Sequence, residues 1–364
     1  MPHGRGEILF TGFPGFIGAR LLPRLLQLSP EWRFRCLVQE RFRAQAEADL
    51  KAIERAHHVA RGRLGLVVGD ITRENLGLSS SEARSLAADL EGAFHLAAVY
   101  DLAVSREVGY RINVEGTRYV LRLLQDAPRF DRLHYVSTAY VSGRATGVFR
   151  ESDLDVGQSF KNHYEETKFL AEVDVVNSGL PATVYRPSIV VGDSRTGETA
   201  KFDGPYFVLS AMERLPSPGV FPRIGSGANR VDLAPVDYVV EGLARLATTR
   251  ASRGRTYHLT DPAPPTTLET ARLFARALGK TFVYVPVPPA VAAAAFSPGA
   301  VQRFFGMPVQ ALEYFHHECR HDPANAVRDL EPLGVSCPPF ASYVDRLVSF
   351  YRAKKAEVRR GAMI

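Results

Sequence analysis

Cysteine is scarce in this sequence, with three residues in 364. Cys36, Cys319 and Cys337 show neither a C-x-x-C spacing nor a regular framework, so the sequence predicts no zinc site and no disulfide scaffold. Thiols are kept reduced in the cytoplasm, and we therefore expect a cytoplasmic protein.

Long apolar runs are lacking as well. No stretch reaches the roughly 20 apolar residues of a membrane-spanning helix, and the segment MPHGRGEILFTG at the start lacks the apolar core of a signal peptide. We expect no transmembrane segment. The most apolar region, residues 282–305, is interrupted by prolines. It is typical of core packing, but could also wall an apolar pocket or touch a membrane surface.

Motifs that read nucleic acid bases are absent, although the sequence is basic. The formal net charge is +6 and the pI about 9.2, with one basic cluster at 352–360. Such a cluster is typical of a solvated helix end, so we expect no nucleic acid partner. The net positive charge suits an anionic cofactor or substrate.

The sequence also has no G-x-S-x-G elbow, which argues against a hydrolase of the Ser-His-Asp type. His317 and His321 have the i, i+4 spacing that could place two ligands on one helix face. The surrounding cluster is more typical of a polar helix or a pocket rim, and we expect no metal site.

Short β-like runs alternate with longer helical stretches through the first half of the sequence. This pattern predicts βαβ units and an α/β fold with a doubly wound parallel sheet. Proline and glycine become frequent after Gly192. We expect a dinucleotide-binding domain over residues 1–192, to which 230–260 returns, and a smaller, irregular, mixed α/β substrate-binding domain over 193–364. The predicted strands are 7–10, 34–38, 64–68, 92–96, 133–136 and 182–185.

A strand, a glycine-rich turn and an amphipathic helix follow one another at the start of the sequence. Gly12, Gly15 and Gly18 form a G-x-x-G-x-x-G pattern. In a Rossmann fold such glycines allow a tight turn, close approach to a pyrophosphate, and packing of helix on strand. The helix N-terminus then offers N–H donors to the phosphates. The motif predicts a dinucleotide site made of Gly12, Phe13, Pro14, Gly15, Phe16, Ile17 and Gly18.

The end of the second predicted strand bears on the choice of dinucleotide. An NAD site usually has an acidic side chain there, for the ribose hydroxyls. Here Glu40 competes with Arg41 and Arg43, either of which could bind a 2′-phosphate. The sequence thus favours NADP(H) over NAD(H), with Arg41 as the expected ligand. Asp70 and Ile71 end the third strand, where Asp70 could accept from the adenine amino group or cap a turn.

Tyr164 and Lys168 have the spacing Y-x-x-x-K, which places both side chains on one face of a predicted helix. Carbonyl reduction needs a proton donor, and a tyrosine with a pKa of about 10 serves better when an ammonium lowers that value. Thr138, at the end of the fifth strand, could orient a substrate carbonyl, with Ser137 as the alternative. Asn113 stands at the predicted start of a helix, where it could serve the site or act as an N-cap.

Six motifs follow one another in the order shown by the extended short-chain dehydrogenase/reductase family. They are T-G-x-x-G-x-x-G at 11–18, H-L-A-A at 95–98, N-V-x-G-T at 113–117, S-T-x-x-x-x-G at 137–143, Y-x-x-x-K at 164–168 and R-P-x-x-V-x-G at 186–192. Over roughly residues 7–250 the sequence therefore resembles that family.

This resemblance implies a catalytic tetrad. Tyr164 would be the general acid/base, and Thr138 would orient the carbonyl. Lys168 would bind the nicotinamide ribose and tune Tyr164, and Asn113 would support a water-mediated proton relay. Further cofactor contacts are implied for Leu96, Ala97, Ala98, Pro187 and Ser188.

Within the family, residues 191–206 resemble the polyketide-pathway reductases and the thioester and fatty-acyl reductase domains. This implies an oxidoreductase that acts on a largely apolar small molecule such as a lipid, a polyketide or an acyl thioester. One alternative is a nucleotide-sugar epimerase or dehydratase with tightly bound NAD, in which Arg223 and Arg230 bind a diphosphate. The other is a non-catalytic protein that senses the nucleotide. Extended family members are often dimers, which implies a homodimer through the helices at 114–125 and 164–178.

Overall fold

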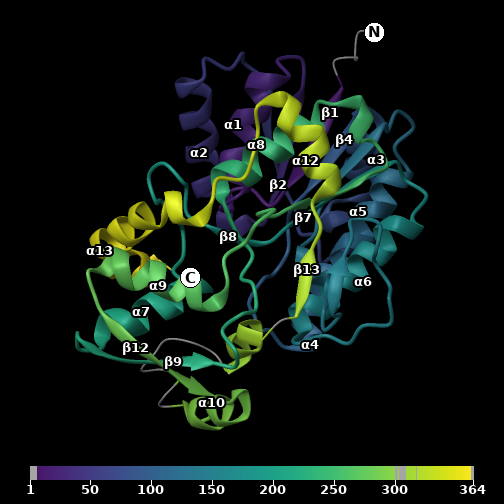
Figure 1. Ribbon diagram of the computed structural model, residues 1–364. Coiled ribbons are helices and arrows are strands. Elements are labelled where there is room, and N and C mark those ends of the chain that lie inside the picture. Colours follow the sequence, from purple (N-terminus) through teal and green to yellow (C-terminus); the bar gives the residue numbers. More distant parts are fainter. Residues whose placement is uncertain (1–5, 300–301, 303–308, 317, 362–364) are drawn as a thin grey trace.

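A seven-stranded, fully parallel sheet forms the centre of the molecule (Figure 1). The computed structural model describes residues 6–299, 302, 309–316 and 318–361. The strand order is β11-β7-β5-β4-β1-β2-β3, which reverses direction between β1 and β4, so a ligand crevice is expected at the carboxyl ends of these two strands. The strands are β1 (Glu7–Thr11), β2 (Arg33–Val38), β3 (Leu64–Val68), β4 (Leu90–His95), β5 (Arg132–Val136), β7 (Ala182–Pro187) and β11 (Thr256–Leu259).

Helices cover both faces of this sheet, and a hydrophobic cluster lies on each side. One cluster joins the sheet to α1 (Gly18–Leu28), α2 (Arg43–Ala56), α8 (Val236–Ala247) and α12 (Ala324–Leu330). The other joins it to α3 (Ser80–Asp89), α5 (Gly116–Gln125) and α6 (His163–Asn177). Because it is covered on both faces, β5 is buried along its whole length. The predicted doubly wound parallel sheet is confirmed.

The helix that carries Asn113 begins earlier than the sequence suggested. Its first turn is α4 (Arg106–Gly109), followed by a π-helical stretch η3 (Tyr110–Glu115) that continues into α5. The N-cap is Ser105, whose hydroxyl accepts from the N–H of Val108 at 3.3 Å. Asn113 is therefore inside the helix, and its interpretation as an N-cap is wrong.

The rest of the chain forms a smaller, less regular part around its own hydrophobic cluster. Two short parallel strand pairs belong to it, β8–β10 and β9–β12, and a third pair, β13–β6, lies beside the large sheet (Figure 1). Its elements are β8 (Ile189–Val191), α7 (Pro205–Arg214), β9 (Gly219–Ile224), β10 (Leu233–Pro235), α9 (Thr267–Leu278), β12 (Phe282–Val287), α10 (Pro289–Phe296) and α13 (Val344–Gly361), while β6 (Gly147–Phe149) and β13 (Cys319–His321) make the third pair.

The apolar region 282–305 begins with β12 and α10. It is only partly packed, since Phe282 and Ala292 are buried while Val283 and Val291 are 66% and 56% exposed. Residues 300, 301 and 303–305 of this region lie outside the described residues, as does His317. Within the described ranges, no helix is both long and apolar enough to cross a bilayer. The same ranges contain no group of three or more potential metal ligands.

Candidate active site at the carboxyl edge of the sheet

The glycine-rich turn lies between β1 and α1, at the point where the strand order reverses. Gly12 has a φ of +88°, and a Cβ there would lie 2.8 Å from the Cβ of Leu96. A Cβ on Gly18 would lie 2.5 Å from the carbonyl oxygen of Gly12, so the helix can approach the turn only because this residue is glycine. Ile17, the N-cap of α1, makes no side-chain cap, and the N–H groups of Ala19 and Arg20 in the first turn donate to the carbonyls of Gly15 and Ile17. The positive end of the helix dipole still faces the turn. These features fit a bound pyrophosphate.

The loop after β4 is held against this turn by Thr11. The Oγ1 atom of Thr11 accepts from the backbone N–H groups of Leu96 and Ala97, both at 3.2 Å. Ala98 follows, and the N–H and carbonyl of Val99 are both hydrogen-bonded to the side-chain amide of Asn113. The sequence-predicted residues 96–98 thus lie beside the glycine turn, on a loop that the protein itself orders.

His95, at the end of β4, has a defined tautomer. Thr117 donates its hydroxyl proton to the carbonyl of Asn113 at 2.6 Å, so its oxygen accepts from Nε2 of His95 at 3.0 Å. Nδ1 of His95 must then accept from Thr11 Oγ1, at 2.8 Å. Burial and the nearby charge of Lys168 lower the pKa of His95 to about 3. His95 is therefore a neutral link that fixes the loop, and the sequence offered only the H-L-A-A motif to find it.

Asn113 is buried, and both ends of its amide are engaged. Its Oδ1 accepts from the N–H of Val99 at 2.9 Å, and its Nδ2 donates to the carbonyl of Val99 and to Oγ1 of Thr167, each at 3.0 Å. Thr167 lies on α6, next to Lys168. Asn113 therefore joins the loop after β4 to the helix that carries Tyr164.

Tyr164 lies in the first turn of α6 and is half-buried. Desolvation raises the pKa of Tyr164 to about 12, although a hydrogen bond with Thr138 acts in the opposite direction. Thr138 follows β5 and is buried. The structure thus brings together Tyr164 and Thr138, as the sequence predicted. The net shift is upward, whereas we expected Lys168 to lower this pKa.

The downward effect that we expected from Lys168 on the pKa of Tyr164 is missing, because the ammonium of Lys168 lies against other groups. Its Nζ donates to the carbonyl of Val136 at 2.8 Å and to the hydroxyl of Tyr135 at 3.1 Å. Desolvation lowers the pKa of Lys168 to about 8. Val136 is two residues before Thr138, so both Lys168 and Tyr164 meet the chain at the end of β5.

Two serine hydroxyls at this edge are buried without a hydrogen-bond partner among the described residues: those of Ser137 and Ser188. They follow β5 and β7, which are neighbours in the sheet. Pro187 ends β7, and its carbonyl accepts from Thr138 at 3.4 Å. A buried hydroxyl without a partner is unfavourable. These two atoms fit polar groups of a dinucleotide, such as the nicotinamide amide.

Of the residues predicted to select the dinucleotide, Arg41 and Arg43 differ in their partners. Arg43 is paired with Glu47 at 3.0 Å and with Glu40 at 3.7 Å. Arg41 is exposed and donates to the side-chain oxygen of Gln39 at 2.8 Å. Arg41 is therefore the more available of the two for a phosphate.

Asp70 caps a turn. Its Oδ1 accepts from the N–H and the hydroxyl of Thr72 at 2.9 and 2.8 Å. Desolvation acts to raise the pKa of Asp70, but the hydrogen bonds from Thr72 and Gln39 outweigh it and keep the pKa low. Ile71 is buried and packs on Gly116, where a Cβ would lie 3.0 Å from its Cδ1.

The structure also aligns a serine, a histidine and an aspartate that sequence reasoning missed. Nε2 of His321 lies 3.1 Å from Oγ of Ser142, and its Nδ1 lies 3.1 Å from Oδ2 of Asp232. All three side chains are buried, and Ser142 is fully inaccessible. A nucleophile has to reach its substrate, so this triad is structural: it ties β13 to the loop after β5.

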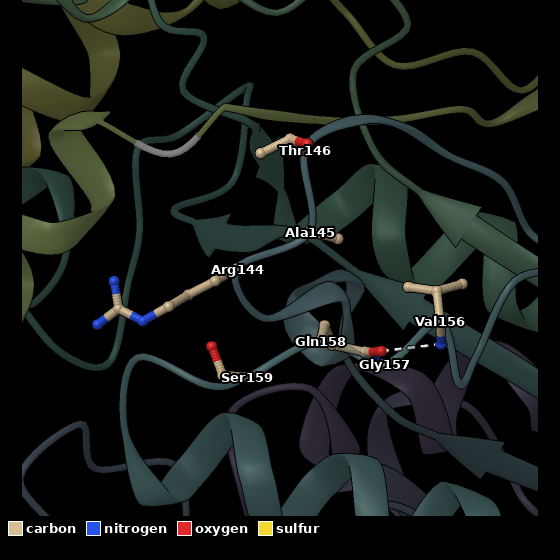
Figure 2. Close-up of a pocket in the computed structure, with 7 residues that line it drawn as sticks. All are labelled: Arg144, Ala145, Thr146, Val156, Gly157, Gln158 and Ser159. Atoms are coloured by element: carbon tan, nitrogen blue, oxygen red, sulfur yellow. Dashed lines mark hydrogen bonds between the residues drawn. The ribbon is translucent and has the colours of Figure 1, made fainter.

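Figure 2 shows a polar hollow beside that loop. Gln158 supports it by donating to the carbonyls of Val141 and Leu154 and by accepting from the N–H of Val156. None of the predicted site residues lines it. The lining residues are Arg144, Ala145, Thr146, Val156, Gly157, Gln158 and Ser159.

Comparison with known proteins places residues 10–243 within the family model described as "Male sterility protein", an NAD-binding family. The chain is 29% identical over 267 residues to a linear gramicidin synthase of Brevibacillus parabrevis, covering 70% of this chain and 5% of that protein. It is 26% identical over 280 residues to a putative fatty acyl-CoA reductase of Drosophila melanogaster, covering 65% of this chain and 53% of that protein. The chain thus spans only part of these relatives.

Among solved structures, the chain superposes on the terminal R domain from the myxalamid PKS-NRPS biosynthetic pathway with a TM-score of 0.81 and 28% identity. The match covers 98% of this chain and 92% of that domain. The family model covers well over half of the chain. The glycine turn, Thr138 and Tyr164 lie within it, as do all strands of the large sheet except β11 and the start of β1. The chain therefore belongs to the Male sterility protein family, and it is an NAD(P)-dependent oxidoreductase of the extended short-chain dehydrogenase/reductase type.

Proposed function

We propose that this chain is a reductase that uses NADPH to reduce an apolar acyl thioester to the aldehyde. The observation that carries the proposal is that Tyr164 meets Thr138 at the carboxyl edge of the sheet that also carries the glycine turn, in a chain that matches a terminal R domain over nearly its whole length. The name of the Drosophila relative, a putative fatty acyl-CoA reductase, supports a thioester with a long apolar acyl group.

The residues at the carboxyl edge supply proton transfer and orientation. NADPH, when bound, supplies the hydride. The hydroxyl of Thr138 orients the carbonyl oxygen of the substrate, and the hydroxyl of Tyr164 protonates that oxygen once the carbonyl carbon has been reduced. A raised pKa keeps Tyr164 protonated at neutral pH, as a proton donor requires. Breaking the carbon–sulfur bond of the resulting hemithioacetal then releases a thiol and the aldehyde.

The cofactor would be held by groups on three sides. The glycine turn and the first turn of α1 would bind the pyrophosphate. Lys168 would bind the nicotinamide ribose, and Ser137 or Ser188 would bind the nicotinamide amide. Arg41 would bind the 2′-phosphate, since Arg43 is already paired with two glutamates.

The alternative of a nucleotide-sugar epimerase receives less support. One of the two arginines that it would use, Arg230, donates to the carbonyl of Pro264. The reductase names of the relatives also favour net reduction over retained NAD. The alternative of a non-catalytic nucleotide sensor receives less support, because the Drosophila relative is named as a putative reductase.

The first test is a reaction of purified chain with NADPH and a long-chain acyl-CoA, with release of free thiol and formation of aldehyde both measured. We expect both products in equal amounts, and a loss of at least about a hundredfold in kcat for Tyr164→Phe. Thiol release without NADPH oxidation, or full activity of Tyr164→Phe, would refute the proposal. Substrate inhibition or slow turnover would not mimic either result.

The cofactor assignment has its own test. Arg41→Ala should raise the KM for NADPH at least tenfold and leave the KM for NADH unchanged, because only NADPH carries the 2′-phosphate. Arg43→Ala is the matched control. Equal effects of the two variants would show that Arg41 does not read the phosphate.

A further inference from the structure

The segment η6 (Val309–His316) packs against the start of α6, the helix that carries Tyr164. Tyr314 of this segment donates its hydroxyl proton to Oε1 of Glu165 at 2.7 Å. The same hydroxyl oxygen accepts from Nδ2 of Asn162 at 3.0 Å. Tyr314 therefore bonds to residues on both sides of Tyr164.

Glu165 is an unusual residue to find in the first turn of this helix, because its side chain is fully buried. One carboxylate oxygen accepts from the N–H of Lys161 at 3.0 Å, and the other lies 3.4 Å from the Lys161 ammonium. That ammonium also donates to the carbonyl of Gly143. A buried charge is tolerated only when it is paired and hydrogen-bonded, so Tyr314 helps to complete a tightly restrained cluster.

The cluster fixes the local geometry of Tyr164. Asn162 is the N-cap of α6, and its Oδ1 accepts from the N–H of Glu165 at 3.0 Å. Tyr164 lies between these two residues, so its backbone cannot shift without disturbing the cap or the buried carboxylate. The ring of Tyr314 meets the ring of Tyr140 edge-on at 5.1 Å, which also ties it to the loop after Thr138.

The segment is also bonded to the loop after β5 and to the loop between β9 and β10. Glu313 pairs with Arg144 at 2.7 Å, and the carbonyl of Phe315 accepts from Nδ2 of Asn229 at 3.5 Å. In the chain this segment follows β12 and α10 of the smaller part. It thus connects the smaller part to the helix that carries Tyr164.

We propose that Tyr314 is a positioning residue for Tyr164, which couples the seating of the 309–316 segment to the placement of the proton donor. The inference rests on the proposed role of Tyr164. The hydroxyl of Tyr314 acts through Asn162 and Glu165, the residues that flank Tyr164, and so affects the rate of the chemical step.

The test compares Tyr314→Phe with Tyr343→Phe. Tyr343 also has a buried hydroxyl, but one that lacks a hydrogen-bond partner within the described part of the chain, in the core of the smaller part. With NADPH and a long-chain acyl-CoA, we expect Tyr314→Phe to lower kcat roughly ten- to a hundredfold, because a hydrogen bond to a charged group is lost. The KM for NADPH should change less than about twofold. The solvent deuterium isotope effect on kcat should rise, because proton donation becomes slower.

Asn162→Ser is the second variant, since serine keeps an N-cap but cannot donate to Tyr314 as the amide does. It should also lower kcat. In the double variant Asn162→Ser/Tyr314→Phe, the loss should be smaller than the sum of the two single effects in free energy. If Tyr314→Phe behaves like Tyr343→Phe, or loses stability without a change in the isotope effect, the coupling is refuted. Failure of the proposed function looks different, since Tyr164→Phe would then retain activity.

Discussion

Replacing Lys168 with methionine is expected to change how the stability of the protein depends on pH. Lys168 is buried and its ammonium is desolvated, which lowers its pKa from the ordinary 10.5 to about 8. At about 1.4 kcal/mol for each pKa unit, this difference corresponds to roughly 3 kcal/mol. Protonation of Lys168 lowers the stability of the folded state by this amount, because the unfolded chain binds the proton more tightly.

The sign follows from the two pKa values. Between pH 8 and 10.5 the unfolded chain holds more protons at this position than the folded chain, so the contribution of Lys168 to stability rises with pH. At pH 7 the charged Lys168 lowers the free energy of unfolding by the full amount, and above pH 10.5 this destabilisation disappears. The variant Lys168→Met has no such dependence. It also loses the hydrogen bonds to Tyr135 and Val136. Any change in these bonds when Lys168 gives up its proton is already contained in the shifted pKa.

Urea unfolding of both proteins at a series of pH values measures this directly. The difference in free energy of unfolding, wild type minus Lys168→Met, should increase by about 3 kcal/mol between pH 7 and pH 10.5. Taking the difference cancels the other titrating groups. A difference that stays constant across this range would show that the ammonium of Lys168 is not desolvated in the folded protein.

Three further substitutions test separate features. Gly12→Ala should weaken NADPH binding at least tenfold, as seen by fluorescence titration, since it adds both strain and a clash; Gly254→Ala, with a φ of +71° but open space around it, controls for strain alone. Glu172→Gln should reduce the free energy of unfolding by about 3 kcal/mol, because it breaks a buried pair with a guanidinium, whereas Asp174→Asn in an exposed pair should cost under about 1 kcal/mol. Ser142→Ala should leave kcat unchanged while lowering stability by about 1–3 kcal/mol; a loss of activity beyond the unfolded fraction would argue against a purely structural triad.

The features that the sequence predicted well are those set by local pattern. Gly12, Gly15 and Gly18 act within one turn, and the spacing of Tyr164 and Lys168 is a property of a single helix. Contacts between distant segments were not predictable in this way. The partners of Lys168 come from β5, which lies 32 and 33 residues away, and those of Glu165 include Tyr314, 149 residues away.

Other differences have equally specific causes. The helix predicted at 114–125 in fact begins at Arg106. Its start was missed because the cap at Ser105 is followed by a π-helical stretch, which breaks the 3.6-residue period. The pKa of Tyr164 was expected to fall because of Lys168, but desolvation of Tyr164 raises it, and the ammonium of Lys168 donates to the carbonyl of Val136. The homodimer, the cytoplasmic location and the adenine contacts of Asp70 and Ile71 stay predictions.

The path of the chain between the two parts of the molecule has a consequence for any attempt to divide it. After β12 and α10 the chain returns to the large sheet, where β13 pairs with β6 and α12 joins the cluster around α8, and only then does it leave again to end in α13. A gene truncation at any point between α10 and Val335 would therefore remove material from both hydrophobic cores at once. The large sheet and the smaller part are interleaved rather than modular, and neither can be exchanged with a relative as a single contiguous segment.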